Sequence, residues 1–546
     1  MGGYQLLPYY DAVSQQKELE HLLVRDERHA AFIADSYARV TNRLAVVDAT
    51  LGPGATNVVS GAAESLAASV PVLFLTGEVN AAISGRSATQ ETDQFAMLRP
   101  AMKLAIQVHR GDRIPELLRR AVLTATDGRA GPVLIDVPED VAHGKYVFDE
   151  GEFAQESDLC KLGRIRSRAS GGSVEKCVQL LKCARRPVII AGGGVHLSGA
   201  YDEVAALATE FQIPVATTIS GKGAIDEYHA MALGVCGRFA RTANEVIRDA
   251  DLVFAIGCKL GEIATDRWSV LPRPVNFVHV DVDGTEIGKI QSVSVGLRGD
   301  ARETLSDILD AMRVERGGWK WHDAGYPTEV ELGVKQWTEQ AESRRRSSEK
   351  PISVARVLSE LEQSLPDGAI VVADGGFAAH WSAILLSVHQ GRTYIANRGQ
   401  ASIGYGLPGA IGASLGAGRE RSIVALCGDN GFAMALAELE TARRAGCRIL
   451  VIVLNNGTLG YVKALQHSLY SGRYQSVDFL EVDFAAAAEA FGCAAWRVDD
   501  PSRLGGSLQE ALTHDGIGVM DVRITTDPRY MLPGVDRRSV ATGLVT

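Results

Sequence analysis

Cysteine pairs, long apolar runs and an excess of positive charge are all absent from this chain of 546 residues. Its eight cysteines form no C-x-x-C pair, and its start lacks the charged and apolar regions of a signal peptide. Apolar runs such as 70–76 and 449–454 are long enough for a strand and too short for a bilayer. With 56 Lys and Arg against 66 Asp and Glu, the net charge of -10 leaves no basic face for a polyphosphate. We therefore expect a cytoplasmic protein with reduced thiols, no membrane span and no nucleic-acid partner.

Short apolar runs alternate with alanine-rich stretches along the whole chain. Strands that alternate with helices form parallel sheets covered on both faces, so the expected fold class is α/β. The chain is too long for one hydrophobic core, and the strand pattern weakens at 149–172 and 316–350. We expect three doubly wound parallel-sheet domains, at 1–155, 170–315 and 350–546. The first opens at Met1-Gly2-Gly3 without a strand and helix of its own, so its N-terminal elements are expected to be missing.

The segment 425–456 carries the most informative pattern. One strand-like run ends in Gly428-Asp429-Asn430-Gly431, and after a helical stretch a second run ends in Asn455-Asn456. Because neighbouring parallel strands end at one crevice, we expect the Asp and Asn oxygens to meet there, where they suit Mg²⁺. The two glycines let backbone amides approach an anion, and a helix expected to begin near Ala433 adds its positive end. The pattern therefore predicts a magnesium-bound diphosphate.

This segment resembles the thiamine diphosphate-dependent enzymes, whose signature is Gly-Asp-Gly, a similar spacer and a closing Asn-Asn, with Asn430 here in place of the third glycine. The resemblance implies thiamine diphosphate and Mg²⁺ as cofactors, and pyrimidine-binding, central and diphosphate-binding domains. It assigns the metal to Asp429, Asn456 and Thr458, and it assigns the diphosphate to Gly428, Asp429, Asn430, Gly431 and Asn456. Taken alone, the pattern also fits an Asp/Asn turn of an unrelated α/β domain.

A second segment, 24–39, resembles the family's His-Glu-x-x-Ala run that closes in Asp-Gly-Tyr-Ala-Arg. Glu27 stands where the family has its catalytic glutamate. A carboxylate in an apolar pocket has a raised pKa and can share a proton with a ring nitrogen of the cofactor's aminopyrimidine. The cofactor itself serves as the electron sink. We expect Glu27 to activate the cofactor, the alternative being an ordinary acid at a helix start.

Two further segments resemble the family's cofactor-binding turns. The run 50–57 is similar to a Ser-Gly-Pro-Gly-Ala-Thr-Asn turn beside the pyrimidine, which implies contacts from Pro53 and Asn57. The run 397–408 is similar to the segment that holds the cofactor bent, with Ile403 as an aliphatic wedge. The carbonyl of Ala401 would accept a hydrogen bond from the aminopyrimidine. Core packing is the alternative for Ile403.

The resemblance covers essentially the whole chain and is nearest to the acetolactate synthase group, as the runs 90–93, 99–103 and 131–138 indicate. It implies an enzyme that decarboxylates a 2-oxo acid, such as pyruvate, and joins the acyl anion to a second carbonyl compound. Gln90 and Lys103 would line the substrate side of the cofactor, Lys103 as a point charge for a carboxylate. The alternative, that Lys103 is an ordinary solvent-exposed lysine, is equally expected.

Two departures from that group concern the substrate pocket. Tyr461 and Leu465 stand where the group usually carries Met and Trp, so the residues that select the acceptor have changed. In the central domain Ile263 replaces an arginine that meets a substrate carboxylate, with Lys259 and Arg267 nearby as candidate substitutes. The same region contacts flavin in relatives, and the sequence leaves open whether FAD is bound.

Three interpretations follow, of which a carboligase is the first. A 2-oxo acid decarboxylase or carbon–carbon lyase without carboligation is the alternative, because protonating the carbanion needs only an altered pocket. A non-enzymatic regulatory subunit is the third, favoured by Asn430. In the family the two cofactor-binding domains, here those of Glu27 and Asp429, meet across a subunit interface, so a homodimer or homotetramer is expected.

Overall fold

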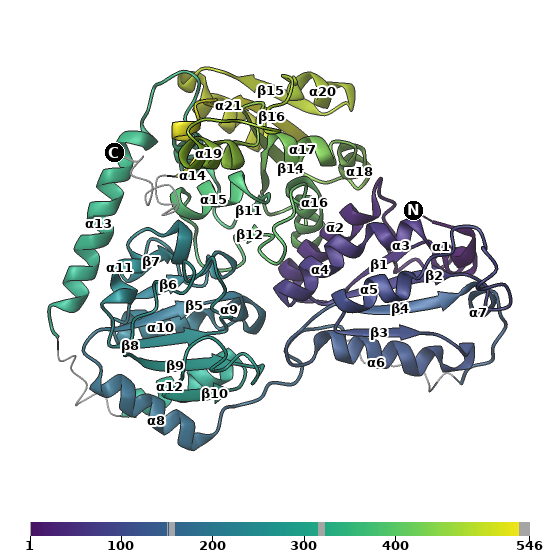
Figure 1. Cartoon of the computed structure of the whole chain (residues 1–546), viewed down its shortest axis with the longest axis horizontal. Coiled ribbons are helices and arrows are strands. Elements are labelled where there is room, and N and C mark those ends of the chain that lie inside the picture. The colour runs from purple at the N-terminus through teal and green to yellow at the C-terminus, as the bar shows by residue number, and fades with distance from the viewer. Residues whose placement is uncertain (1, 150, 152–158, 315–322, 534–546) are drawn as a thin grey trace.

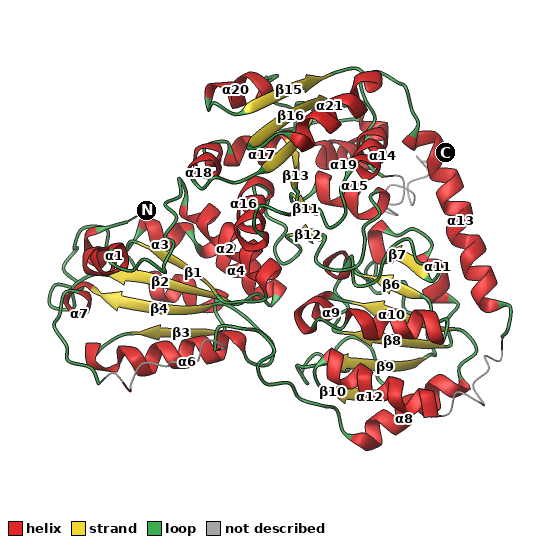
Figure 2. Ribbon diagram, turned by 180° about the vertical axis from the view of Figure 1, so that it is seen from behind, coloured by secondary structure: helices red, strands yellow, loops and turns green. Residues whose placement is uncertain are grey.

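The computed structural model describes residues 2–149, 151, 159–314 and 323–533. They form three units, each built on one parallel sheet with helices on both faces (Figures 1 and 2). The predicted α/β class with three parallel sheets is confirmed. Within these described ranges, no helix is long and apolar enough to cross a membrane.

The first unit contains a four-stranded sheet in the order β1-β2-β4-β3. Its strands are β1 (Ala45–Ala49), β2 (Val72–Glu78), β3 (Leu104–Gln107) and β4 (Val133–Pro138). Its helices are α1 (Leu7–Ser14), α2 (Glu27–Thr41), α3 (Pro53–Asn57), α4 (Val59–Ala68), α5 (Gln94–Leu98), α6 (Ile114–Thr126) and α7 (Glu139–Ala142). The helix α1 lies where the sequence predicted no opening helix, and none of its residues is buried.

The central unit contains a six-stranded sheet in the order β10-β9-β8-β5-β6-β7. Its strands are β5 (Pro187–Ala191), β6 (Val215–Thr217), β7 (Ala232–Val235), β8 (Leu252–Ile256), β9 (Asn276–Asp281) and β10 (Val295–Arg298). Its helices are α8 (Gly171–Cys183), α9 (Gly193–Ser198), α10 (Tyr201–Glu210), α11 (Ala243–Arg248) and α12 (Ala301–Val314). The strand order reverses between β5 and β8, which opens a crevice at their carboxyl ends.

The predicted linkers differ in how much of them is described. Residues 150 and 152–158 of the first lie outside the described residues, as do 316–322 of the second. The rest of the second linker contains the helix α13 (Tyr326–Arg345), which runs along the outer side of the molecule from the central to the third unit (Figure 1). This helix was not predicted, because its apolar residues do not follow one face.

The third unit contains a six-stranded sheet in the order β12-β11-β13-β14-β16-β15. Its strands are β11 (Ile370–Ala373), β12 (Tyr394–Ala396), β13 (Ile423–Gly428), β14 (Ile449–Asn455), β15 (Ala494–Val498) and β16 (Ile517–Arg523). Its helices are α14 (Val354–Ser364), α15 (Phe377–Leu385), α16 (Gly406–Ala417), α17 (Asp429–Ala435), α18 (Glu438–Arg444), α19 (Gly460–Tyr470), α20 (Phe484–Ala490) and α21 (Pro501–Thr513). The register pairs Gly428 with Leu454, so the residues after both strands leave the sheet at one edge.

The helix α2 joins the first unit to the third. Its alanines, such as Ala31 and Ala34, pack into the core of the first unit, whereas Phe32 and Ile33 pack into a core cluster of the third. On the facing helix α16, a Cβ atom at Gly412 would lie 2.0 Å from the carbonyl oxygen of Ile33. Glycine therefore permits the close approach of these two helices.

Candidate active site

Glu27 is the first residue of α2, and its position is fixed by the residues around it. Asp26 caps the helix by accepting a 2.8 Å hydrogen bond from the backbone amide of Arg28. The Glu27 side chain is buried, and Nδ2 of Asn57 donates to its Oε2 atom at 3.0 Å. The structure thus brings together two of the predicted cofactor residues from α2 and α3.

The electrostatics of Glu27 differ from the prediction. Burial alone raises the pKa of its carboxyl group, but hydrogen bonds, among them the one from Asn57, outweigh burial and lower the pKa. The predicted raised pKa is therefore wrong for this arrangement. The sequence identified the apolar surroundings but not the donors that stabilise the carboxylate.

The turn that carries Pro53 is held by a residue that the sequence analysis missed. Gln94 accepts a 2.8 Å hydrogen bond from the Gly52 amide and donates at 2.8 Å to both Gly77 and Asp136. Gly52 has a positive φ of 66°, which glycine adopts without strain, and Pro53 then begins α3. No motif marks Gln94, because its three partners come from distant parts of the sequence.

The two residues predicted on the substrate side have different surroundings. Gln90 is exposed and lies against the turn, where a Cβ atom at Gly52 would be 2.4 Å from its carbonyl oxygen. The Lys103 ammonium donates to the carbonyls of Thr124 and Asp127, at 2.5 and 2.8 Å, at the end of α6. These bonds explain the position of Lys103 without a substrate, because a lysine often binds the last carbonyls of a helix. Its role in binding the substrate stays a prediction.

Asp429 lies at the centre of the second half of the site. Its Oδ2 atom accepts from the amides of Asn456 and Gly457, at 3.0 and 2.6 Å, and its Oδ1 atom accepts from Asn430 at 2.7 Å. Burial raises the pKa of this carboxyl group. Gly428 caps α17, which begins at Asp429 and not near Ala433 as predicted, because the acidic turn is itself the first turn of the helix.

The predicted metal ligands lie together at this edge of the sheet. Asn456 Nδ2 is buried and has no hydrogen-bond partner among the described residues, while Oδ1 accepts from Thr458 at 3.3 Å. An amide oxygen has two lone pairs, so Oδ1 can accept this bond and still contact a cation. The Thr458 hydroxyl donates to Val477 at 2.8 Å, and its carbonyl accepts from Gly460 at 2.8 Å with one lone pair left.

A cation here would be bound mostly by oxygens other than carboxylates. Within the described parts of the chain, no group of three or more His, Cys, Asp or Glu side chains could hold a metal ion. One carboxylate, an amide and a backbone carbonyl form a set of hard ligands that suits Mg²⁺ completed by phosphate oxygens.

The loop between β12 and α16 carries Ala401 and Ile403. Ala401 has a positive φ of 57°, unusual for a residue with a side chain. The buried side chain of Glu64 in α4 accepts hydrogen bonds from three consecutive amides of this loop, of Gly399, Gln400 and Ala401. The sequence analysis missed Glu64, which lies 337 residues from Ala401.

Tyr461 and Leu465 lie one turn apart on α19. Both pack against an apolar cluster that contains Phe377, Met531 and Leu532. The Tyr461 ring also lies edge-on to His380, with 4.7 Å between the ring centroids. A change at either position therefore alters the volume beside α15.

The predicted residues form two groups. Glu27, Pro53, Asn57 and Gln90 belong to the first unit, and the third unit holds Ala401, Ile403, Gly428, Asp429, Asn430, Gly431, Asn456 and Thr458. Among the contacts of the described residues, none joins Glu27 to Asp429. An active site that uses both Glu27 and Asp429 is therefore not formed by these contacts within one chain.

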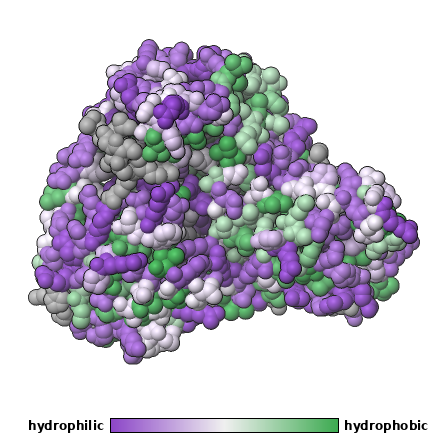
Figure 3. Space-filling model, viewed as in Figure 1, coloured by the Kyte–Doolittle hydropathy of each residue, from purple (hydrophilic) through white to green (hydrophobic). Residues whose placement is uncertain are grey.

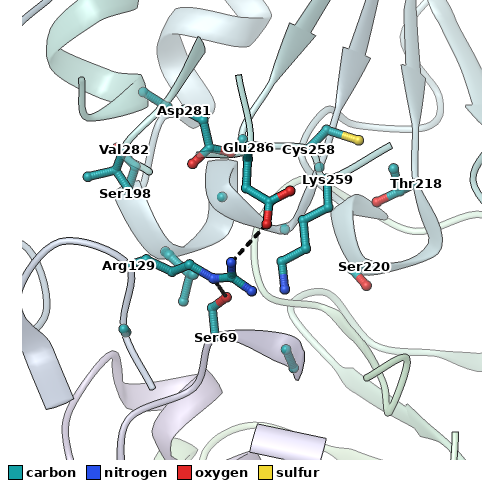
Figure 4. A pocket seen from close by; sticks show the side chains of 18 of the residues that line it. Ser69, Arg129, Ser198, Thr218, Ser220, Cys258, Lys259, Asp281, Val282 and Glu286 are labelled. Carbon is teal, nitrogen blue, oxygen red and sulfur yellow. Dashed lines mark hydrogen bonds and ion pairs between the residues drawn. The ribbon is translucent and has the colours of Figure 1, made fainter. Parts of the chain in front are cut away.

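A separate cavity of about 430 Å³ lies in the hollow where the units meet (Figures 3 and 4). It lies at the carboxyl ends of β5 and β8, between the glycine turns 192–194 and 257–261. Lys259 extends into it between Arg129 and Ser220, and Arg129 is held by Glu286 at 2.9 Å (Figure 4). Burial lowers the pKa of Lys259 to about 8.

The candidates to replace the arginine whose place Ile263 takes in the central unit differ in position. Lys259 lines this cavity together with Ile263 and donates to the carbonyl of Ala67 at the end of α4. Arg267 is exposed and pairs with Glu262 at 3.4 Å. Arg398 also lines the cavity, and its Nη1 atom is buried without a partner among the described residues.

Three family models match the chain, one for each unit. The N-terminal TPP binding domain of the thiamine pyrophosphate enzymes matches residues 2–97, the central domain 174–308, and the C-terminal TPP binding domain 374–522. The probable acetolactate synthase large subunits of Methanococcus aeolicus and Methanocaldococcus jannaschii are 32% and 33% identical to all of this chain, over 91% of each protein. The acetolactate synthase isozyme 3 large subunit of Escherichia coli (strain K12) is 31% identical over 93% of this chain and 88% of that protein.

Proposed function

Because the chain belongs to the thiamine pyrophosphate enzymes and is similar over its whole length to acetolactate synthase large subunits, we propose that it is a thiamine diphosphate-dependent carboligase. It would decarboxylate a 2-oxo acid such as pyruvate and join the acyl anion to a second carbonyl compound. The observation that carries this proposal is the buried Glu27 carboxylate held by Asn57, in a chain whose three units all match the family.

The residues of the first unit would prepare the reaction. Thiamine diphosphate, when bound, supplies a nucleophilic carbon and an electron sink. The pKa of Glu27 is lowered, and its carboxylate, oriented by Asn57, would exchange a proton or a hydrogen bond with the cofactor. The burial of Glu27 excludes water from this exchange.

The residues of the third unit would bind the diphosphate. Asp429, Asn456 and Thr458 would hold Mg²⁺, and the hydrogen bonds among them keep these three residues together. The amides at Gly428, Asn430 and Gly431 lie at the same turn. Ala401 would present its carbonyl to the aminopyrimidine, and Ile403 would support the bent cofactor from below.

A homodimer or homotetramer would complete the site. The two groups of predicted residues do not touch within the described part of one chain. Beside Gly457, the amide of Phe479 donates to the Gly457 carbonyl at 2.8 Å, and the side chains of Phe479, Leu480 and Val482 are exposed. Exposed apolar side chains next to a metal segment suit an interface with a second copy. Sedimentation as an active monomer would refute this part of the proposal.

FAD is the proposed occupant of the central cavity. The crevice where strand order reverses is the usual place for a dinucleotide, and Lys259 and Arg398 offer positive charge for a diphosphate. Asp281 at the end of β9 offers a carboxylate for ribose hydroxyls. Flavin absorbance released on denaturing the purified protein would test this, and its absence after reconstitution with FAD would exclude the cofactor.

A cytoplasmic location remains part of the proposal. All eight cysteines are free, and six of them are buried. Free thiols suit a reducing compartment.

Product analysis tests the function. The protein is incubated with thiamine diphosphate, Mg²⁺ and pyruvate, with and without added aldehydes, and carbon dioxide and products are measured by mass spectrometry. Acetolactate or a mixed acyloin is expected. Carbon dioxide with aldehyde alone would favour the decarboxylase alternative, and no reaction with pyruvate or larger 2-oxo acids would favour a lyase.

A further inference from the structure

The loop between β12 and α16 is held in a conformation that it would not keep unaided. At φ 57° the Cβ atom of Ala401 crowds its own backbone, which is unfavourable for a residue with a side chain. Such a residue persists only where its surroundings fix it. Its neighbours therefore determine where the Ala401 carbonyl and the Ile403 side chain lie.

Glu64 supplies the fixing contacts. Its Oε1 atom accepts from the Gly399 amide at 2.9 Å, and its Oε2 atom accepts from Gln400 and Ala401 at 2.5 and 3.3 Å. The side chain is fully buried. A Cβ atom at position 399 would lie 2.5 Å from the Glu64 carbonyl oxygen, so glycine is needed for this approach.

The charge of Glu64 is balanced from its own unit. Arg39 Nη2 donates to Oε1 of Glu64 at 3.1 Å, and Arg39 Nε donates to Asp35 at 2.7 Å. Asp35 accepts in turn from the Tyr405 hydroxyl at 2.8 Å. The first unit thus holds the loop at both ends, at 399–401 through Glu64 and at Tyr405 through Asp35.

We propose that Glu64 is the positioning residue of the cofactor loop, acting through the amides of Gly399, Gln400 and Ala401 to place the Ala401 carbonyl and Ile403 against thiamine diphosphate. The cofactor part of this proposal rests on the proposed function. The hydrogen bonds from these three amides to Glu64, here called the clamp, do not rest on the proposed function, since they are made by the chain alone.

The clamp is tested first on the protein without added cofactor. Hydrogen exchange of peptides that cover 397–405 is measured in the wild type, Glu64→Gln and Glu64→Ala. In Glu64→Ala the three loop amides lose their hydrogen bonds to a charged acceptor, which are stronger than bonds to a neutral one. Hydrogen exchange of these amides should therefore be at least about tenfold faster in this variant. The isosteric Gln variant keeps the packing and should show a smaller increase. Unchanged loop exchange in both variants would overturn the proposal.

A matched control separates the clamp from general destabilisation. Glu227 is equally buried between units and pairs with Lys222 at 2.5 Å, but it contacts no part of the loop 397–405. Glu227→Gln should lower the melting temperature and leave loop exchange as in the wild type. Equal loop exchange in the Glu227 and Glu64 variants would overturn the specific role.

The cofactor part is tested by binding and turnover. Glu64→Gln should raise the Kd of thiamine diphosphate roughly tenfold and change the near-ultraviolet circular dichroism of the bound cofactor, with most of the turnover restored at saturating cofactor. Glu227→Gln should do neither. A fast-exchanging loop with unchanged Kd and dichroism would overturn the positioning role, whereas a wild type that binds no thiamine diphosphate would overturn the proposed function itself.

Discussion

The Asn57 side chain donates a 3.0 Å hydrogen bond to the Glu27 carboxylate, which fixes the last residue of α3 to the first turn of α2. Glu27 begins α2 and Asn57 ends α3, and both helices belong to the first unit. This hydrogen bond joins two segments about 30 residues apart in the sequence, which together can form half of a cofactor site. Asn57 thus orients the Glu27 carboxylate, which is buried.

Replacing Glu27 tests its proton transfer. Glu27→Gln keeps the shape and the contact with Asn57 but cannot exchange a proton, so turnover should fall by about 10² to 10⁴ while the Kd of thiamine diphosphate stays close to the wild type. Glu18→Gln, at an exposed position of the same unit, should leave both unchanged. Near-normal turnover of Glu27→Gln would remove Glu27 from the mechanism.

Replacing Asp429 tests the metal site. Asp429→Asn retains an acceptor for the amides of Asn456 and Gly457 but removes the charge, so thiamine diphosphate should be retained far less well in the presence of Mg²⁺. Asp499→Asn, an exposed aspartate of the third unit, is the control. Binding titrated at several Mg²⁺ concentrations measures the effect, and an unaltered dependence on Mg²⁺ would contradict the assignment.

A pair of buried carboxyl groups should make stability depend on pH. Burial, and then the neighbouring Asp136, raise the pKa of Glu78 to about 7, and burial raises that of Asp136 to about 6. The folded state then holds protons that the unfolded state has released, so stability should fall as the pH rises from about 4 to about 7. Glu78→Gln should remove part of this decline, by about 1 to 3 kcal/mol at pH 8.

Thermal unfolding at pH 5 and pH 8 measures this linkage. Glu175→Gln, at an exposed position of the central unit, should follow the wild type at both pH values. A Glu78→Gln variant whose melting temperature changes with pH as much as that of the wild type would show that the pair does not retain a proton.

The contact between α2 and α16 should tolerate no side chain at Gly412. A Cβ atom there would meet the Ile33 carbonyl at 2.0 Å, so Gly412→Ala should destabilise the protein by about 1 to 3 kcal/mol. Gly506→Ala is the matched change on the exposed helix α21, where nothing lies within 4 Å. It should stabilise by about 0.4 to 1 kcal/mol. Similar effects in the two variants would show that the close approach is not required.

Substitutions in α19 should change which acceptor the enzyme selects. Tyr461→Met and Leu465→Trp alter the side chains that pack with Phe377, Met531 and Leu532, and should change the ratio of products from competing acceptors. The Kd of thiamine diphosphate should not change, because neither residue belongs to the diphosphate turn. Leu469→Trp, exposed one turn further along α19, is the control. Identical product ratios in all variants would exclude α19 from selecting the acceptor.

The sequence predicted what short segments determine by themselves. Asp429 and Asn456 end adjacent parallel strands, so alternation of strands and helices was enough to bring them together. Glu27 and Asn57 belong to motifs whose spacing is visible in the sequence. The parallel sheets followed for the same reason, because central strands such as β5, β8 and β14 are buried and almost continuously apolar.

What the sequence could not predict depends on distant partners. Gln94 and Glu64 are ordinary polar residues until the fold gives them the amides of Gly52 and of the loop 399–401. The lowered pKa of Glu27 depends on donors that composition does not reveal, and the carbonyls that bind Lys103 lie at the end of a distant helix. Helix α17 began earlier than expected because its acidic turn is part of the helix.

The role of Glu27 in activating the cofactor can be measured without knowledge of the substrate. The exchange of the thiazolium C2 proton of bound thiamine diphosphate for deuterium is timed in the wild type and in Glu27→Gln, with Mg²⁺ present and cofactor saturating. We expect fast exchange in the wild type and slowing by about 10² or more in Glu27→Gln. Equal exchange rates in the two proteins, with the cofactor bound to both, would contradict the role of Glu27.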